Sequence, residues 1–279
     1  MTAESAEVAP RIPSDESLPL PGHPLPTDPR EPGRSAGAAP AVATALYDTI
    51  HRRRDVRGQF TGGPLPPGSL ERVLAAAHAA PSVGLSQPWD FVIVTDLAVR
   101  TAFYDHVQQE RQTFAETLTG EAAERFKSIK IDGVLESTVS VVVTYDPGRG
   151  APNVLGRHAI ADAGLYSVCL AIENLWLAAT AEGLGVGWVS FYREPVLARL
   201  VHLPERVRPV AWLCIGPVTH LEALPDLERH GWRYRAPLAG VLHYDRWEQR
   251  PPTGADESST TQTTTKPTTK TPREVETTT

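Results

Sequence analysis

Four arginines and one aspartate stand within the six residues from Arg52 to Arg57. Each guanidinium presents a planar fork of donors that suits phosphate oxygens. Helical spacing over 42–54 puts this cluster at a helix C-terminus, which repels anions, so any phosphate here must be held by side-chain charge. A solvated basic patch that offsets the helix dipole is the alternative interpretation, and composition alone favours it.

The segment from Pro81 to Trp89 holds two serines, a glutamine and a tight-turn glycine, with prolines that restrict its backbone. It joins a predicted helix to a predicted strand. A rigid polar loop at that place suits a polar ligand. An ordinary helix-to-strand connection is an equally good interpretation.

Three glycines at positions 183, 185 and 187 superficially resemble a dinucleotide-binding fingerprint. That fingerprint leaves a strand and opens a helix, whereas these glycines follow a helix and enter a strand. We therefore predict no Rossmann site and interpret Gly183 as the helix C-cap. Gly185 and Gly187 allow either close backbone approach to a flat group or close packing.

No metal site is expected, because the histidines and cysteines lack metal-ligand spacing; those considered are His78, His158, His202, Cys169 and Cys214. The sequence has no G-x-S-x-G elbow that would mark a nucleophilic serine.

The composition is that of a globular protein, with 41% hydrophobic and 22% charged residues. A net charge of -6 and a pI near 5.9 argue against nucleic-acid binding. Residues 1–10 carry no signal-peptide pattern, and charges interrupt the apolar stretch 165–188, so no membrane association is expected. Two cysteines make no disulfide framework. We therefore expect a cytoplasmic protein.

The chain divides into a disordered Pro-rich tail (1–40), a folded domain (41–250) and a disordered Thr-rich tail (251–279). Apolar periodicity predicts helices over 42–54, 67–80 and 162–182, and two helices broken near Gly120 within 97–130. Strands are expected over 91–95, 139–145, 186–191 and 210–215, with 139–145 buried on both faces. The alternation indicates an α+β domain around a central sheet.

Six short sequence words occur in an order that resembles the 5,6-dimethylbenzimidazole synthase family, a branch of the nitroreductase-type flavoprotein fold. The words are Arg53-Arg54-Asp55-Val56-Arg57, Ala80-Pro81-Ser82-Val83-Gly84, Gln87-Pro88-Trp89-Asp90-Phe91, Val154-Leu155-Gly156-Arg157, Asn174-Leu175-Trp176-Leu177-Ala178-Ala179 and Gly185-Val186-Gly187-Trp188-Val189-Ser190. The resemblance covers about residues 46–247. It implies a nitroreductase-like α+β fold with a mixed, mostly antiparallel sheet flanked by helices.

Two places depart from the family pattern. The segment 158–164 lacks the usual Pro-Glu-Met approach to the central helix, and Glu173 stands before Asn174 where glutamine is usual. These departures affect local lid or dimer contacts and leave the expected fold unchanged.

The resemblance implies an enzyme that consumes reduced FMN with dioxygen. The flavin ring is fragmented to 5,6-dimethylbenzimidazole, the lower ligand of cobalamin, and the ribityl arm leaves as erythrose 4-phosphate. A separate flavin reductase would supply the reduced FMN. Because this fold usually builds its flavin pockets between two subunits, a symmetric homodimer is expected.

The resemblance also implies a set of site residues. Asp55 and Ser190 would be catalytic, because bond fragmentation needs directed proton transfers. An Arg-paired carboxylate and a strand-end hydroxyl without a role are the structural alternatives for these two residues. The flavin-binding residues would be Arg53, Arg54, Asp55, Val56, Arg57, Pro81, Ser82, Gln87, Lys130, Gly187, Trp188 and Ser190, with the three arginines on the phosphate.

Two other functions fit the same fold. One is an FMN-dependent NAD(P)H nitroreductase, and fold-level analogy cannot distinguish it. Asp55, Ser190 and the helix-rich insertion 97–130, which would seal the flavin from a nicotinamide, favour the synthase. The other is a flavin-binding module without turnover.

Overall fold

The computed structural model describes residues 40–247. The two predicted tails, 1–40 and 251–279, lie outside the described residues except for Pro40, which begins the first helix. The chain forms two compact units that divide between Tyr234 and Arg235. Residues 40–234 contain the strands and the helices α1 to α7. Residues 235–247 contain the short 3-10 helix η2, Leu238–Gly240.

The first unit contains helices and strands interspersed along the chain. That order is α1 Pro40–Arg52, α2 Ser69–His78, η1 Val83–Leu85, β1 Phe91–Val94, α3 Leu97–Ala115, α4 Gly120–Ser128, β2 Val139–Tyr145, α5 Ala163–Ala181, β3 Leu184–Val189, α6 Glu194–Leu200, β4 Arg208–Pro217 and α7 Asp226–Arg229.

The four strands form one antiparallel sheet in the order β1-β2-β4-β3. At its centre Val142 of β2 lies opposite Val92 on one side and Trp212 on the other. All seven residues of β2 are buried, which confirms the expectation from its β-branched run. A parallel pairing also occurs, as an isolated bridge between Asp55 and Val186 at the β3 edge. The expected α+β architecture is confirmed.

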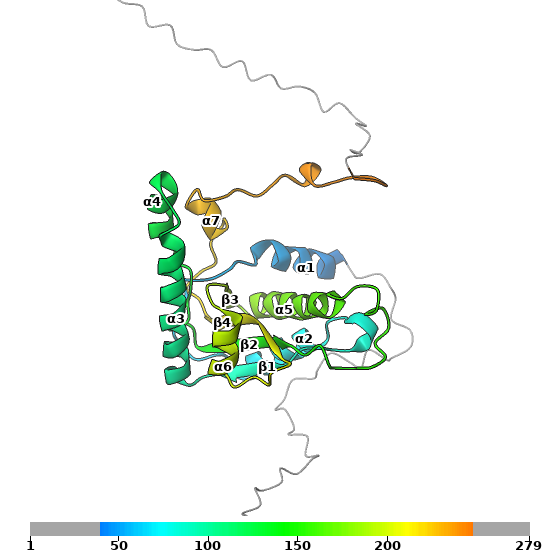
Figure 1. Cartoon of the computed structure of the whole chain (residues 1–279). Coiled ribbons are helices and arrows are strands. Elements are labelled where there is room, and N and C mark those ends of the chain that lie inside the picture. The colour runs from blue at the N-terminus through cyan, green and yellow to red at the C-terminus, as the bar shows by residue number, and fades with distance from the viewer. Residues whose placement is uncertain (1–39, 248–279) are drawn as a thin grey trace, which may run out of the picture. The chain divides into compact units, whose positions relative to one another are not determined.

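Alternate side chains of the sheet enter two separate cores. Val141 and Leu213 pack with α2 and α5, whereas Trp212 packs with α3 and stacks on Phe103 at 3.8 Å between ring centroids. Figure 1 shows α3 along one side of the sheet, with α4 continuing beyond it, and α5 on the other side, with α1 beside α5. Because successive strand side chains point to opposite faces, both faces of the sheet are apolar, and helices pack against each of them.

The central helix α5 is packed as its sequence predicts. It ends at Ala181 with Glu182 as the C-cap residue, and the following Gly183 takes a φ of 76°, so the expected glycine does terminate the helix, one position after the C-cap. Within residues 40–247 it is the one helix long and apolar enough to cross a membrane, and 50% of that apolar stretch is buried inside the protein. Such burial is typical of the core helix of a globular domain.

Some element boundaries differ from expectation. Helix α1 ends at Arg52 because the chain leaves it to pair with β3, where the Val56 N–H bonds to the Val186 carbonyl. Strand β3 covers 184–189 instead of 186–191, so Ser190 follows the strand. Helix α6 was not predicted, since seven residues are too few for a clear helical period.

Candidate functional site

Five of the predicted site residues meet at one pocket of about 380 Å³. They come from the segment after α1, the segment after α4 and the end of β3. The predicted residues that line it are Asp55, Arg57, Lys130, Trp188 and Ser190. The fold thus brings together residues of the first and last of the six motifs, 53–57 and 185–190.

Asp55 and Arg57 continue the hydrogen bonding of the β3 edge. The Asp55 carboxylate accepts the Trp188 N–H at 2.9 Å, and Arg57 donates to the Trp188 carbonyl at 2.6 Å. Arg57 also donates to both carboxylate oxygens of Asp55, at 2.7 and 2.5 Å. Two charged side chains therefore bond to the N–H and the carbonyl of Trp188, at an edge of β3 that no further strand covers within residues 40–247. The two side chains also hold each other in a bidentate pair.

The pKa of Asp55 is raised above its ordinary value. Burial of the carboxylate is the largest cause and outweighs the lowering effects of Arg57, of the Trp188 N–H and of Arg53. Asp55 lines the pocket, and about 45% of its side-chain surface is exposed. The group is therefore accessible, and its surroundings hold its pKa above that of an ordinary aspartate.

Gly185 and Gly187 are required by close packing around Val56. A Cβ on Gly187 would lie 2.1 Å from the Val56 carbonyl oxygen, and one on Gly185 would lie 2.4 Å from a Val218 methyl and 3.0 Å from a Val56 methyl. Of the two interpretations that the sequence left open, close packing accounts for both glycines. A contact of Gly187 with a flavin ring stays a prediction.

The other two predicted phosphate ligands, Arg53 and Arg54, do not line this pocket. The Arg53 guanidinium lies 5.0 Å above the Trp176 ring, and its Nε is 3.6 Å from the Glu173 carboxylate. Arg54 donates to the His51 carbonyl at 2.7 Å, so it satisfies the C-terminus of α1. The three arginines therefore have different surroundings, although they stand in one short sequence motif.

Lys130 lies in the wall between two cavities. It lines the Asp55 pocket and also an adjoining one of about 270 Å³ on its other side. Its ammonium forms an ion pair with Glu136, and both side chains are 42% exposed. The lysine is thus at the pocket, as the resemblance implies, with its charge balanced by a residue that the sequence analysis did not single out.

The loop with Pro81, Ser82 and Gln87 does not line the Asp55 pocket. The Ser82 hydroxyl accepts the Gln87 N–H at 3.0 Å, and the Gln87 amide donates to the His78 carbonyl at 3.4 Å. Gln87 has a φ of 41°, a left-handed backbone conformation that residues other than glycine rarely adopt. The loop is therefore rigid and strained, and within one chain it is separate from the pocket.

Five further residues line the pocket and were not predicted: Ile129, Ile131, Phe191, Asp226 and Leu227. The first three flank Lys130 and Ser190 in the sequence, so adjacency to those residues could have identified them. The last two belong to α7, and nothing in the sequence pattern links α7 to the other segments.

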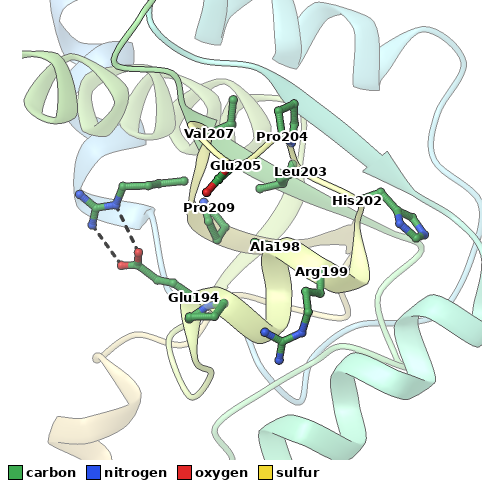
Figure 2. Close-up of a pocket in the computed structure, with 11 residues that line it drawn as sticks. Glu194, Ala198, Arg199, His202, Leu203, Pro204, Glu205, Val207 and Pro209 are labelled. Carbon is green, nitrogen blue, oxygen red and sulfur yellow. Dashed lines mark hydrogen bonds and ion pairs between the residues drawn. The ribbon is translucent and has the colours of Figure 1, made fainter.

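A second, larger groove of about 790 Å³ lies between α6 and the start of β4. Figure 2 shows Leu203, Val207 and Pro209 among its lining residues. Glu194 and Arg208 also line it and form an ion pair at 3.2 Å. It contains none of the predicted site residues. Among residues 40–247 no group of histidine, cysteine, aspartate or glutamate side chains could hold a metal ion.

Comparisons with known proteins point to one family. The chain matches the model described as the nitroreductase family over residues 50–217. It is 37% identical over 198 residues to a 5,6-dimethylbenzimidazole synthase of Rhodospirillum rubrum, which covers 71% of this chain and 93% of that protein. A Rhodobacter capsulatus protein of the same name is 32% identical over 206 residues, or 74% and 96% of the two chains.

Solved structures share the fold. An oxidized iodotyrosine deiodinase bound to FMN and 3-iodo-L-tyrosine superposes with a TM-score of 0.57 at 24% identity. The superposition covers 72% of this chain and 100% of that one.

Proposed function

The chain belongs to the nitroreductase family, and we propose that it is a 5,6-dimethylbenzimidazole synthase, as its 37% identical relative is named. One observation of the structure carries the proposal. Asp55 and Ser190, the two residues expected to act on the flavin, line the same pocket although they stand far apart in the sequence.

The substrate is reduced FMN, which reacts with dioxygen to yield 5,6-dimethylbenzimidazole and erythrose 4-phosphate. The pocket fits such a molecule, because it combines apolar walls from Ile129, Ile131 and Phe191 with the charged groups of Lys130 and Asp55. A flat ring with polar edges needs this mixture of apolar contact and oriented polar groups.

Asp55 and Ser190 are the catalytic residues of this proposal. The raised pKa of Asp55 lets its carboxyl keep a proton closer to neutral pH than an ordinary aspartate does. The Trp188 N–H and Arg57 hold that carboxyl in one orientation. The Ser190 hydroxyl makes no hydrogen bond with another of the described residues, so it is available to a bound molecule.

The three arginines bind the phosphate group. Arg53 has the most donors left for this contact, because the bidentate pair with Asp55 engages Arg57, and backbone carbonyls of His51 and Arg53 engage Arg54. The Arg53–Glu173 distance of 3.6 Å is longer than a hydrogen bond, so Arg53 keeps donors for a phosphate oxygen.

A symmetric homodimer completes the site. Helices α1 and α5 pack together, and between them expose a set of apolar side chains, namely Val42, Leu46, Ile50, Tyr166 and Leu170. A second copy of the chain would cover this surface. The same pairing would bring the strained loop of Ser82 and Gln87 from one subunit to the pocket of the other, which explains why one chain keeps the two groups apart. Light scattering at micromolar concentration tests the dimer, and a monomeric mass would refute it.

The enzyme works in the cytoplasm with reduced FMN delivered by a separate flavin reductase. This part of the proposal rests on composition and on the family resemblance. An FMN-dependent NAD(P)H nitroreductase is the alternative, since a 27% identical relative is named as a putative NADH dehydrogenase/NAD(P)H nitroreductase.

One experiment separates these functions. The full chain is incubated with chemically reduced FMN in air, and 5,6-dimethylbenzimidazole is measured by mass spectrometry. Its appearance in proportion to the enzyme supports the synthase. Its absence together with rapid NADPH oxidation would identify a nitroreductase, and FMN recovered intact without NADPH oxidation would identify a binding module.

A further inference from the structure

The four residues from 190 to 193 connect β3 to α6 and lie against α3. This connection begins with Ser190, which lines the Asp55 pocket, and ends with Arg193, the N-cap residue of α6. Four residues held at both ends leave little freedom, so contacts made by the last three decide where Ser190 lies.

Two polar contacts join the end of this connection to α3. The Arg193 backbone N–H donates to Nε2 of His106 at 3.0 Å, and the Arg193 guanidinium pairs with Glu110 at 2.8 Å. Glu110 is 20% exposed, whereas Arg193 is 64% exposed. The backbone contact is the more restrictive one, because it holds the main chain itself.

Two aromatic contacts join the middle of the connection to the same helix. Phe191 meets Phe114 edge-on at 5.6 Å, and Tyr192 meets Phe103 at 5.7 Å. The four α3 residues involved stand at positions 103, 106, 110 and 114. Steps of three, four and four residues place them on one face of the helix.

We propose that His106 and Glu110 are positioning residues that set the place of the Ser190 hydroxyl in the pocket. This inference rests on the proposed function and assigns a task to α3, which lies in the helix-rich insertion. The helix acts on Ser190 through its contacts with residues 191–193. Phe103 and Phe114 also belong to the core, so their contacts cannot be tested without disturbing the fold.

Matched substitutions at His106 test the backbone contact. His106→Leu keeps the bulk and removes the acceptor, whereas His106→Gln offers an amide oxygen to the Arg193 N–H. In the flavin-free protein, hydrogen exchange of the Arg193 amide should become at least about tenfold faster in the leucine variant and stay near the wild-type rate in the glutamine variant.

The same variants are then compared with reduced FMN at saturation. His106→Leu and Glu110→Gln should bind FMN as the wild type does but form about tenfold less 5,6-dimethylbenzimidazole per dioxygen consumed, since small displacements of a reacting group have large effects. His106→Gln should restore the product yield. Glu194→Gln breaks a comparable ion pair, between the first residue of α6 and Arg208 of β4, and should change neither measurement.

Unchanged product yield in His106→Leu, with wild-type protein forming product, would overturn the inference and leave the proposed function standing. Equal loss in His106→Leu and His106→Gln, with a lowered melting temperature, would also overturn it, since it would indicate general destabilisation. If the wild type forms no product, the proposed function fails, and the exchange experiment alone still decides whether His106 holds the connection.

Discussion

The Asp55 carboxylate accepts a hydrogen bond from the Trp188 backbone N–H at 2.9 Å. This contact places a carboxyl group where a neighbouring strand would otherwise pair with β3. Because Ser190 follows Trp188 by two residues, the contact ties both proposed catalytic groups to one short piece of backbone. The geometry of the pair therefore depends on the β3 edge and on the close approach that Gly187 permits.

Replacing Asp55 by asparagine separates its structural and chemical roles. The Asn amide oxygen can still accept the Trp188 N–H, so Asp55→Asn should fold, bind reduced FMN and consume dioxygen. Product should fall at least a hundredfold, since loss of a positioned proton donor or acceptor costs about 10²–10⁴-fold. Oxidised FMN and hydrogen peroxide, measured by absorbance and a peroxidase assay, should appear instead.

The matched control is Asp105→Asn, an exposed carboxylate of α3 outside the pocket, which should behave as the wild type. If Asp55→Asn only weakens FMN binding and turns over normally at saturation, the carboxylate is a structural partner of Arg57. The proposed catalytic assignment would then be wrong.

Ser190→Ala removes one hydroxyl that has no partner among the described residues. We expect its melting temperature and its FMN affinity to stay near those of the wild type, because no protein contact is lost. Product per dioxygen consumed should fall by about 10²-fold or more. A full yield of product, measured by mass spectrometry at saturating reduced FMN, would assign the hydroxyl no chemical role.

Arg53→Ala should affect binding and spare the chemistry. Loss of a charge-assisted phosphate contact should weaken FMN binding by roughly 1.5–3 kcal/mol, measured by fluorescence titration, while bound flavin is still fragmented. Arg208→Ala, remote from the Asp55 pocket, is the control for loss of an arginine. Wild-type affinity in Arg53→Ala would exclude Arg53 from the phosphate site.

Glu173→Gln should change affinity in the opposite direction. The Glu173 carboxylate lies 3.6 Å from Arg53 and is 50% exposed, so it competes with a phosphate for the guanidinium and repels it. Exposed ion pairs are worth up to about 1 kcal/mol, which corresponds to at most about fivefold tighter FMN binding. Glu71→Gln, an exposed glutamate of α2, should leave affinity unchanged, and tightening in both variants would show only a general charge effect.

The stability of the domain should depend on pH through Asp146. A hydrogen bond from the Arg206 side chain is the main cause that lowers the pKa of this carboxyl, which is 5% exposed as a residue. A lowered folded pKa stabilises the native state above the ordinary value of 3.8, and this stabilisation is lost as the pH falls below it. Because Arg206 is 67% exposed, the contribution is on the order of 1 kcal/mol.

Urea unfolding of Asp146→Asn checks this expectation. The variant should be less stable than the wild type at pH 7, and the difference should shrink at pH 3. A difference that stays constant between the two pH values would show that the charge of Asp146 does not contribute.

Local patterns in the sequence were sufficient for the elements whose burial follows a regular period. The β-branched run 139–145 became the fully buried β2, and the apolar positions between 162 and 182 became α5. The sequence also identified Asp55, Arg57, Lys130 and Ser190 as candidates, through short words that resemble a family. Apolar periodicity and the order of short motifs are properties of the sequence itself, so both can be recognised in a single amino-acid sequence.

The tertiary structure alone decided which of these candidates meet. It paired Asp55 with Trp188, placed Arg53 and Arg54 outside the pocket, balanced Lys130 with Glu136 and added Leu227 from α7. It also packed one face of α3 against the connection that contains Ser190, where the Arg193 N–H bonds to His106. Such contacts join segments far apart in the chain, and they form because both faces of the sheet and the edge of β3 must be covered at once, a condition that no local pattern expresses.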